Sequence, residues 1–269
     1  MFKVQQNIVQ KTKPSGWTLI ELLVVMSIIS MLTAMLLPSL NRAREQAKRI
    51  DCSSNLRQLT FAWYAYTVDN DGRLCSPDTN WNDGLFTTNR HHWVADGPDI
   101  PDNGIGGTEI AIKNGVLWPY TKTADLYKCK SDWTDLLRSY SLSNTMGGYD
   151  CKCGNMTTPF LNYAQISRSP ERMVFIGAHS SKGWIVDGFW PISDIDPEVA
   201  GWAAPSSNNI TIRHSDGCNL SFADNHCEYW KWTDPRTVEF AKRQISADEA
   251  SSYNTDLQRM LELLKGPLD

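Results

Sequence analysis

The feature that most constrains this chain is an uninterrupted apolar run near its N-terminus. From Trp17 to Leu40, Glu21 is the only charged residue. As an α-helix these residues would extend about 36 Å, which is enough to cross a hydrocarbon core of about 30 Å. A carboxylate inside such a core costs at least ~2.5 kcal/mol, so the acid at position 21 requires an explanation.

The remainder of the chain has the composition of a water-soluble protein. Its 269 residues carry a formal net charge of −4, and the mean hydropathy is −0.38. Beyond the N-terminal third there is no long basic run, so no nucleic-acid partner is expected. A secretory signal would have a shorter apolar region followed by a small-residue cleavage site. The run is therefore a membrane anchor attached to a soluble body.

The residues that open the run carry a specific motif. Gly16 is followed by the sequence WTLIE. This resembles the processing signal of type IV prepilins and type II secretion pseudopilins. The resemblance implies that a prepilin peptidase cuts between Gly16 and Trp17 and that Trp17 becomes the N-methylated first residue, where the family usually has Phe. Pro38 matches a proline that often kinks the family's assembly helix. Other pilin or pseudopilin subunits and an inner-membrane assembly platform are the further partners implied.

Cleavage would also explain the isolated acid. The new amine at Trp17 would lie one helical turn from Glu21. In a bundle of such helices, the carboxylate of one subunit and the amine of a neighbour would neutralise each other in a medium where neither charge is tolerated alone. Glu21 is therefore predicted to be an assembly residue.

Beyond the membrane, the helix is expected to continue as an amphipathic element. Apolar residues recur at spacings of four and three, giving one apolar face: Cys52, Leu56, Leu59, Trp63 and Tyr66. The sequence DNDG at 69–72 is typical of a turn and ends the element. We predict a helix from Trp17 to about Val68, with its second half packed on the soluble domain.

Four further segments carry a second resemblance. CSSNLRQL begins at Cys52, LYKCKSD spans 126–132, RSYSLSNTMG spans 138–147, and His214 is followed after nine residues by Asp224. These are similar to large bacterial prepilin-like proteins named for an H-X9-DG motif near the C-terminus. Asn225 stands where that group has Gly. Metal or acid–base chemistry at His214, Asp224 and His226 is one interpretation of this motif. The other is a tight turn with histidines bonded to nearby backbone.

The soluble part has the pattern of an α+β domain. CNLSFADNHCEYW predicts a β-hairpin turning at Asp224 and Asn225. Further strands are predicted at 172–178 and 184–190, and helices at 234–245 and 254–266, the last capped by Asn254 and Gly266. The expected fold is loop-rich, with an antiparallel sheet packed on the long helix and short C-terminal helices.

These elements define four segments. A prepilin leader covers 1–16, a transmembrane assembly helix 17–40, the soluble half of the helix 41–70, and a globular domain 71–269. The expected location is a single pass through the inner membrane with the domain in the periplasm, followed by incorporation into a filament or pseudopilus, or display at the cell surface.

Cysteine spacing leaves the redox state open. Seven cysteines are present, so at least one is unpaired within the chain. One to three disulfides are expected in an exported domain, with inert thiols as the alternative. A zinc site is not predicted, because no CxxC pair is present. No motif for catalysis is found either, so the chain is predicted not to be an enzyme.

Two binding hypotheses remain. Asp194, Asp196 and Glu198 alternate along an acidic stretch that either binds Ca²⁺ or is simply solvated. Eleven tryptophans either fill the core or form an aromatic surface. The aromatic surface favours the alternative function, a membrane-anchored surface or periplasmic module that binds a ligand such as a carbohydrate. The structural subunit is the leading hypothesis.

Overall fold

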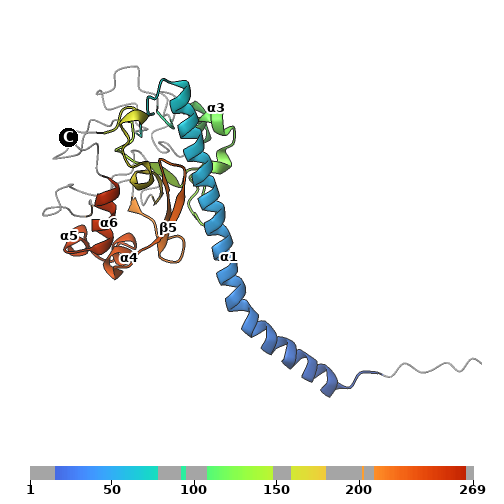
Figure 1. The fold of residues 1–269 in the computed structure, drawn as a ribbon. Helices are drawn as coiled ribbons and strands as arrows, with labels where there is room; N and C mark the ends of the chain where they lie inside the picture. The colour runs from blue at the N-terminus through green and yellow to red at the C-terminus, as the bar shows by residue number, and fades with distance from the viewer. Residues whose placement is uncertain are drawn as a thin grey trace, which may run out of the picture. The chain divides into compact units, whose positions relative to one another are not determined.

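The computed structural model describes residues 16–77, 92–94, 108–147, 159–179, 202 and 209–264. The chain divides into two compact units, residues 1–44 and residues 45–269. One helix, α1 (Leu19–Asp69), begins in the first unit and ends in the second. Its bounds agree with the predicted 17–68 to within two residues at the N-terminal end and one at the C-terminal end (Figure 1).

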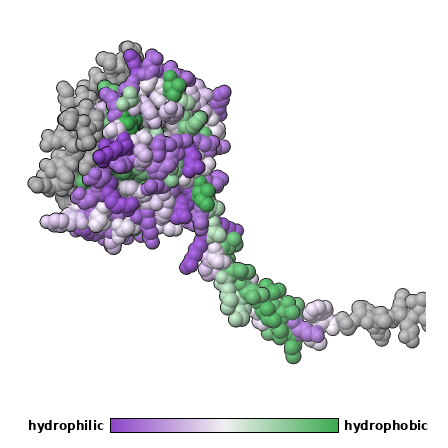
Figure 2. Space-filling view, viewed as in Figure 1, coloured by the Kyte–Doolittle hydropathy of each residue, from purple (hydrophilic) through white to green (hydrophobic). Residues whose placement is uncertain are grey.

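In the first unit, α1 packs against no other part of the chain that the structure describes. Every residue from 16 to 44 is exposed, and the N-terminal stretch presents a continuous hydrophobic surface (Figure 2). This helix is long and apolar enough to cross a membrane. The hydroxyl groups that follow Glu21 in the run donate to carbonyls of the same helix, so none needs water: Ser27, Ser30, Thr33 and Ser39.

In the second unit, α1 buries the predicted face. Leu56, Leu59 and Trp63 are fully buried, and Cys52 and Tyr66 nearly so. Burying large apolar side chains of this kind stabilises the fold by about 1.5–3 kcal/mol each. The helix ends at the predicted turn, where Gly72 takes a φ of 79°. The amphipathic pattern of this half is confirmed.

An antiparallel sheet forms the centre of the second unit. Its strands pair in the order β1-β2-β4-β5, with β3 joined to the end of β2. The strands are β1 (Tyr140–Leu142), β2 (Met173–His179), β3 (Asn209–Ile210), β4 (Gly217–Phe222) and β5 (Cys227–Lys231). The predicted strand at 172–178 and the predicted hairpin are confirmed, while 184–190 lies outside the described residues.

The two faces of β4 contact different partners. Thr60 of α1 donates to the hydroxyl of Ser221 at 2.6 Å, so this face lies against the long helix. Leu220 belongs to a second hydrophobic cluster that includes Phe240 and Leu257. This alternation is the period-two pattern of a strand buried on both faces. The sheet is therefore covered by α1 on one side and by the C-terminal helices on the other.

Short helices complete the domain. They are α2 (Glu109–Asn114), α3 (Trp118–Thr121), η1 (Ala124–Tyr127), η2 (Tyr163–Gln165), η3 (Ser169–Glu171), α4 (Pro235–Ala241), α5 (Ala247–Ser251) and α6 (Thr255–Leu263). The predicted helices at 234–245 and 254–266 correspond to α4 and α6. Gly266, the predicted C-cap of the last helix, lies outside the described residues, and α6 ends before it with Leu264 at the C-cap. The amide of Leu264 already bonds to the carbonyls of Met260 and Leu261, which closes the final turn two residues earlier.

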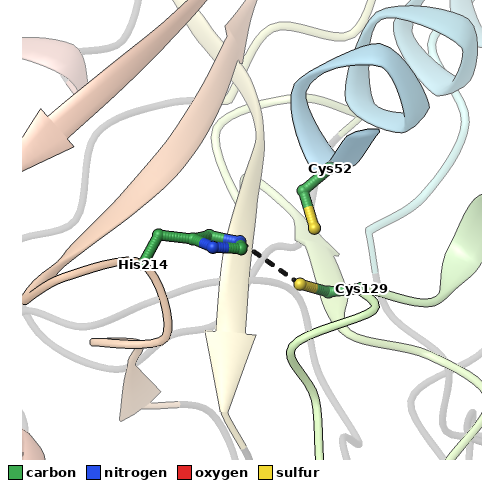
Figure 3. Close-up of side chains that lie close together, drawn as sticks. All are labelled: Cys52, Cys129 and His214. Carbon is green, nitrogen blue, oxygen red and sulfur yellow. Dashed lines mark hydrogen bonds between the residues drawn. The ribbon is translucent and has the colours of Figure 1, made fainter. Parts of the chain in front are cut away.

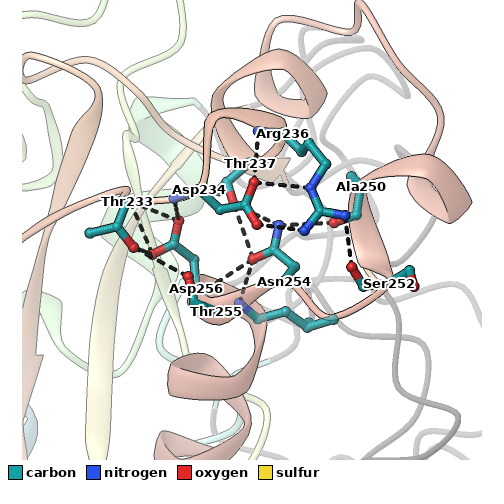
Figure 4. A network of polar contacts seen from close by, with 10 residues as sticks. Thr233, Asp234, Arg236, Thr237, Ala250, Ser252, Asn254, Thr255 and Asp256 are labelled. Carbon is teal, nitrogen blue, oxygen red and sulfur yellow. Dashed lines mark hydrogen bonds and ion pairs between the residues drawn. The ribbon is translucent and has the colours of Figure 1, made fainter.

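A buried polar network joins α4 to α6 (Figure 4). The carboxylate of Asp256, fully buried, accepts from the amides of Thr233 and Asp234 and from the hydroxyl of Thr233. Asn254 caps α6 through its side-chain oxygen, as predicted, and bonds Thr237 of α4. Each buried polar group is thereby satisfied, which is the condition under which such groups are tolerated in a core.

Candidate functional site

Two residues of the predicted processing motif, Thr18 and Glu21, cap the N-terminus of α1. The backbone amide and the hydroxyl of Thr18 donate to one carboxylate oxygen of Glu21 at 2.8 and 2.9 Å, and the amide of Glu21 donates to the Thr18 hydroxyl at 3.3 Å. This reciprocal arrangement is a capping box. The predicted assembly role of Glu21 does not include this local role, although the T-x-x-E spacing before an apolar run is the sequence signal of a capping box.

Glu21 has no cationic partner among the described residues. Trp17 lies directly before the cap and is exposed, so an amine created there would stand beside the carboxylate. A capping carboxylate is favoured at a helix N-terminus because it faces the positive end of the helix dipole. The cap therefore holds the acid at the end of the apolar helix, beside the residue that processing would expose.

Pro38 lies inside α1, within the apolar surface. Proline has no amide hydrogen, so it cannot donate to the carbonyl one turn earlier in the helix. Nearby, the hydroxyl of Ser39 donates to the carbonyl of Leu36 at 2.8 Å. The helix continues through the proline to Asp69. Its predicted role in assembly stays a prediction.

His214 and Asp224, the two ends of the C-terminal motif, lie apart. His214 precedes β4 and Asp224 follows it, so the six residues of the strand separate them by about 20 Å. The structure does not bring them into one site. Sequence spacing suggested proximity because a turn-containing motif is short in sequence, but an extended strand places its ends far from each other.

Asp224 and Asn225 form the hairpin turn between β4 and β5. Asn225 has a φ of 71°, the left-handed conformation that glycine and asparagine adopt most readily. Asn225, which stands where the H-X9-DG group has Gly, therefore preserves the turn. Asp224 accepts from the amide and from Nδ1 of His226. Partial burial raises the pKa of Asp224, but these hydrogen bonds outweigh it and hold the pKa below its usual value. The interpretation of this end as a turn is supported.

His214 lies in a buried cluster with two thiols (Figure 3). Its Nδ1 is 3.0 Å from a carboxylate oxygen of Glu45, and its Nε2 is 3.3 Å from the sulfur of Cys129. The sulfur of Cys52 completes the group, and the three donor atoms lie within 4.8 Å of one another. The residues come from α1, from the segment after η1, and from the turn that precedes β4.

The thiols of this cluster differ from the other buried thiols. The hydrogen bond from Cys129 lowers the pKa of Cys52, and the same bond raises the pKa of Cys129. Elsewhere, burial raises the pKa of Cys75 and Cys218, which is the behaviour of inert thiols. The five cysteines in the described part of the chain are free thiols, so the predicted disulfides are not formed among them. Cys151 and Cys153 lie outside it.

The tryptophans in the described part of the chain mostly fill the core. Trp93 and Trp202 are buried and stack against Tyr127 and Phe240 respectively. This favours the core interpretation over an aromatic ligand surface for these two positions. Trp81, Trp184 and Trp190 lie outside the described residues. So does the acidic stretch with Asp194, Asp196 and Glu198, where calcium binding stays a prediction.

Comparison with known proteins places the N-terminal features in a family. A family model described as the prokaryotic N-terminal methylation motif matches residues 12–37. The competence protein ComGC of Halalkalibacterium halodurans is 35% identical over 103 residues, which is 88% of its own length and 38% of this chain. The chain belongs to the type IV pilin-like proteins. No solved structure matches it.

Membership in the pilin-like family defines the kind of protein. A pilin-like protein is a structural subunit rather than an enzyme, and the family implies other pilin subunits and a processing prepilin peptidase as partners. The α+β fold, with its long apolar helix and antiparallel sheet, agrees with that assignment. The match to ComGC leaves well over half of the chain unaccounted for.

Proposed function

We propose that this pilin-like protein is a filament subunit whose mature N-terminus is created by cleavage after Gly16 and N-methylation of Trp17. It then assembles through residues 17–40 into a type II secretion pseudopilus or a type IV pilus-like filament, on an inner-membrane platform. Residues 41–70 and 71–269 form the part exposed in the periplasm. The observation that carries the proposal is the apolar half of α1. It is fully exposed in the single chain, and one capping acid stands at its start.

The physical reason for assembly is the same exposed surface. In the bilayer these side chains lie in lipid, and in a filament they pack against copies of themselves. Glu21 adds directionality, because its carboxylate would meet the methylated amine of a neighbouring Trp17 once Gly16 has been removed. A pair of opposite charges is tolerated in a low-dielectric medium only when the partners are close and hydrogen-bonded.

Processing is tested by intact mass and N-terminal sequencing of the membrane-extracted protein. We expect a chain that starts at Trp17 and carries one added methyl group. A Gly16→Val variant serves as the control, because it removes the cleavage site outside α1, and it should retain the leader. A wild-type chain that still starts at Met1 would contradict the proposal.

Assembly is tested with two variants that separate the cap from the charge. Glu21→Gln keeps an oxygen for the capping box but removes the charge, and we expect normal cleavage with filament incorporation reduced about tenfold or more. Thr18→Ala removes the cap but keeps the charge, and it should assemble. Incorporation is measured as the fraction of protein in sheared filaments. Normal assembly of Glu21→Gln would exclude the charge pairing.

A further inference from the structure

The cluster of Cys52, Cys129 and His214 has the chemistry of a metal site. All three residues are at most 3% exposed, and their donor atoms converge within 4.8 Å. Tetrahedral zinc with Zn–S bonds of 2.3 Å and a Zn–N bond of 2.0–2.1 Å places neighbouring donors about 3.6–3.8 Å apart. The Cys129–His214 separation of 3.3 Å is close to that spacing.

The orientation of His214 is fixed in the way metal-binding histidines usually are. A carboxylate oxygen accepts, so Nδ1 donates its hydrogen to Glu45. The lone pair then lies on Nε2, the atom that faces the two sulfurs. The hydroxyl of Tyr229 donates to the backbone carbonyl of His214 at 2.6 Å and holds that residue in place. A carboxylate behind a histidine is the outer-shell partner that orients metal ligands.

A small cavity of about 10 Å³ is lined by the three ligands. This is about the space of one water-sized sphere. Asn219 also lines it. The side-chain oxygen of Asn219 is buried without a hydrogen-bond partner in the described part of the chain, while its nitrogen donates to the carbonyl of Arg49. A buried amide oxygen of this kind is normally paired. A water bound to an ion in the cavity would supply the missing donor.

The charge balance also favours a divalent cation. The nearby guanidinium of Arg213 is paired with Asp132 at 2.8 Å, and both side chains are at most 2% exposed. That pair is neutral, so it leaves the cluster without an added net charge. A divalent ion with two thiolates and a neutral imidazole is neutral as well, and the carboxylate of Glu45 behind the imidazole has the amine of Lys48 3.9 Å away. Binding therefore leaves no uncompensated charge in the protein interior.

We propose that Cys52, Cys129 and His214 bind one divalent ion of the zinc type, with a water as fourth ligand and Glu45 as the positioning residue for His214. On binding, each thiol that is protonated loses its proton, so uptake of one ion releases up to two protons and forms two metal–sulfur bonds. The ion joins α1 to two segments of the domain. The ligands on these two segments, Cys129 and His214, are 85 residues apart in the sequence. Cys52 is the first buried residue of α1, so the ion fastens the helix where it first buries a side chain in the domain.

The test uses the full chain in detergent, with thiols kept reduced and metal removed by a chelator. Titration with Zn²⁺ should give one bound ion per chain and a higher Tm. Co²⁺ should give the intense absorption of tetrahedral thiolate coordination. Cys52→Ala, Cys129→Ala and His214→Gln should each lose the cobalt spectrum. Cys75→Ala is the matched control, since Cys75 is equally buried in the same hydrophobic core, and it should bind like the wild type.

Glu45→Gln measures the positioning role separately. It should still bind one ion, with affinity reduced about 10- to 100-fold, because the imidazole loses its charged partner while the ligands remain. Circular dichroism of the metal-free variants shows that each is folded. Three results would overturn the proposal: no cobalt–thiolate spectrum in the folded wild type, an equal loss of binding in Cys75→Ala, or a Cys52–Cys129 disulfide in protein taken directly from membranes.

Discussion

The two halves of α1 have the same secondary structure and opposite surroundings. Residues 16–44 expose every side chain, whereas the half from Cys52 to Thr67 buries one face against the sheet. In the first half the apolar residues occur all around the helix, and in the second they follow spacings of three and four. A helix that is apolar on all sides requires lipid or other helices, while an amphipathic helix requires one partner surface. One continuous element therefore serves both membrane anchoring and domain packing.

A large effect is expected when one substitution is applied to both halves of the helix. Leu56 is fully buried and Leu32 is 55% exposed. Leu56→Ala should lower the free energy of unfolding of the domain by about 2–5 kcal/mol, because it removes buried methyl groups and leaves a cavity. Leu32→Ala should change it by less than about 0.5 kcal/mol. Chemical denaturation of the full chain in detergent measures both values. Equal effects would mean that the two halves are not independent.

The next comparison is between two acidic residues, one in each unit of the chain. Asp132 pairs with Arg213 inside the domain, whereas the proposed partner of Glu21 lies on another chain. Asp132→Asn leaves a buried guanidinium without its anion, and it should cost about 3–5 kcal/mol of domain stability. Glu21→Gln should leave that stability unchanged. Denaturation midpoints of the two variants test this, and a large loss in Glu21→Gln would show that the cap supports the domain.

The buried pair also predicts a pH dependence. Burial raises the pKa of Asp132, but Arg213 and hydrogen bonds from Ser139 and Thr134 outweigh it, so the pKa in the folded chain lies below its usual value. The stabilisation is therefore complete above the unfolded pKa of about 3.9 and is lost as the pH falls through the lower folded value. Asp132→Asn should flatten this part of the stability profile. If the stability profile of Asp132→Asn matched that of the wild type, other groups would be responsible for the loss of stability in acid.

Local patterns predicted much of the fold and little of the cluster. The period of Cys52, Leu56 and Leu59 marked a buried helix face, and Asn225 marked a turn, because each signal arises within a few residues. Cys52, Cys129 and His214 converge only through packing of α1 on the sheet, which no local spacing encodes. The same limit explains why the motif from His214 to Asp224 suggested one site, although its ends lie at opposite ends of β4.

The smallest expected effect concerns two threonines in similar helical settings. Thr60 shares its one hydroxyl hydrogen between the carbonyl of Leu56 and the hydroxyl of Ser221 of β4, whereas Thr33 donates only to Ile29 of its own helix. Thr60→Val keeps the shape but leaves the buried Ser221 hydroxyl without this donor, and it should cost about 1 kcal/mol of domain stability. Thr33→Val should cause no measurable loss of domain stability, because the hydroxyl of Thr33 bonds only within its own helix. Thermal unfolding of both variants decides the comparison, and a cost for Thr33→Val would mean that the apolar half contributes to the stability of the domain.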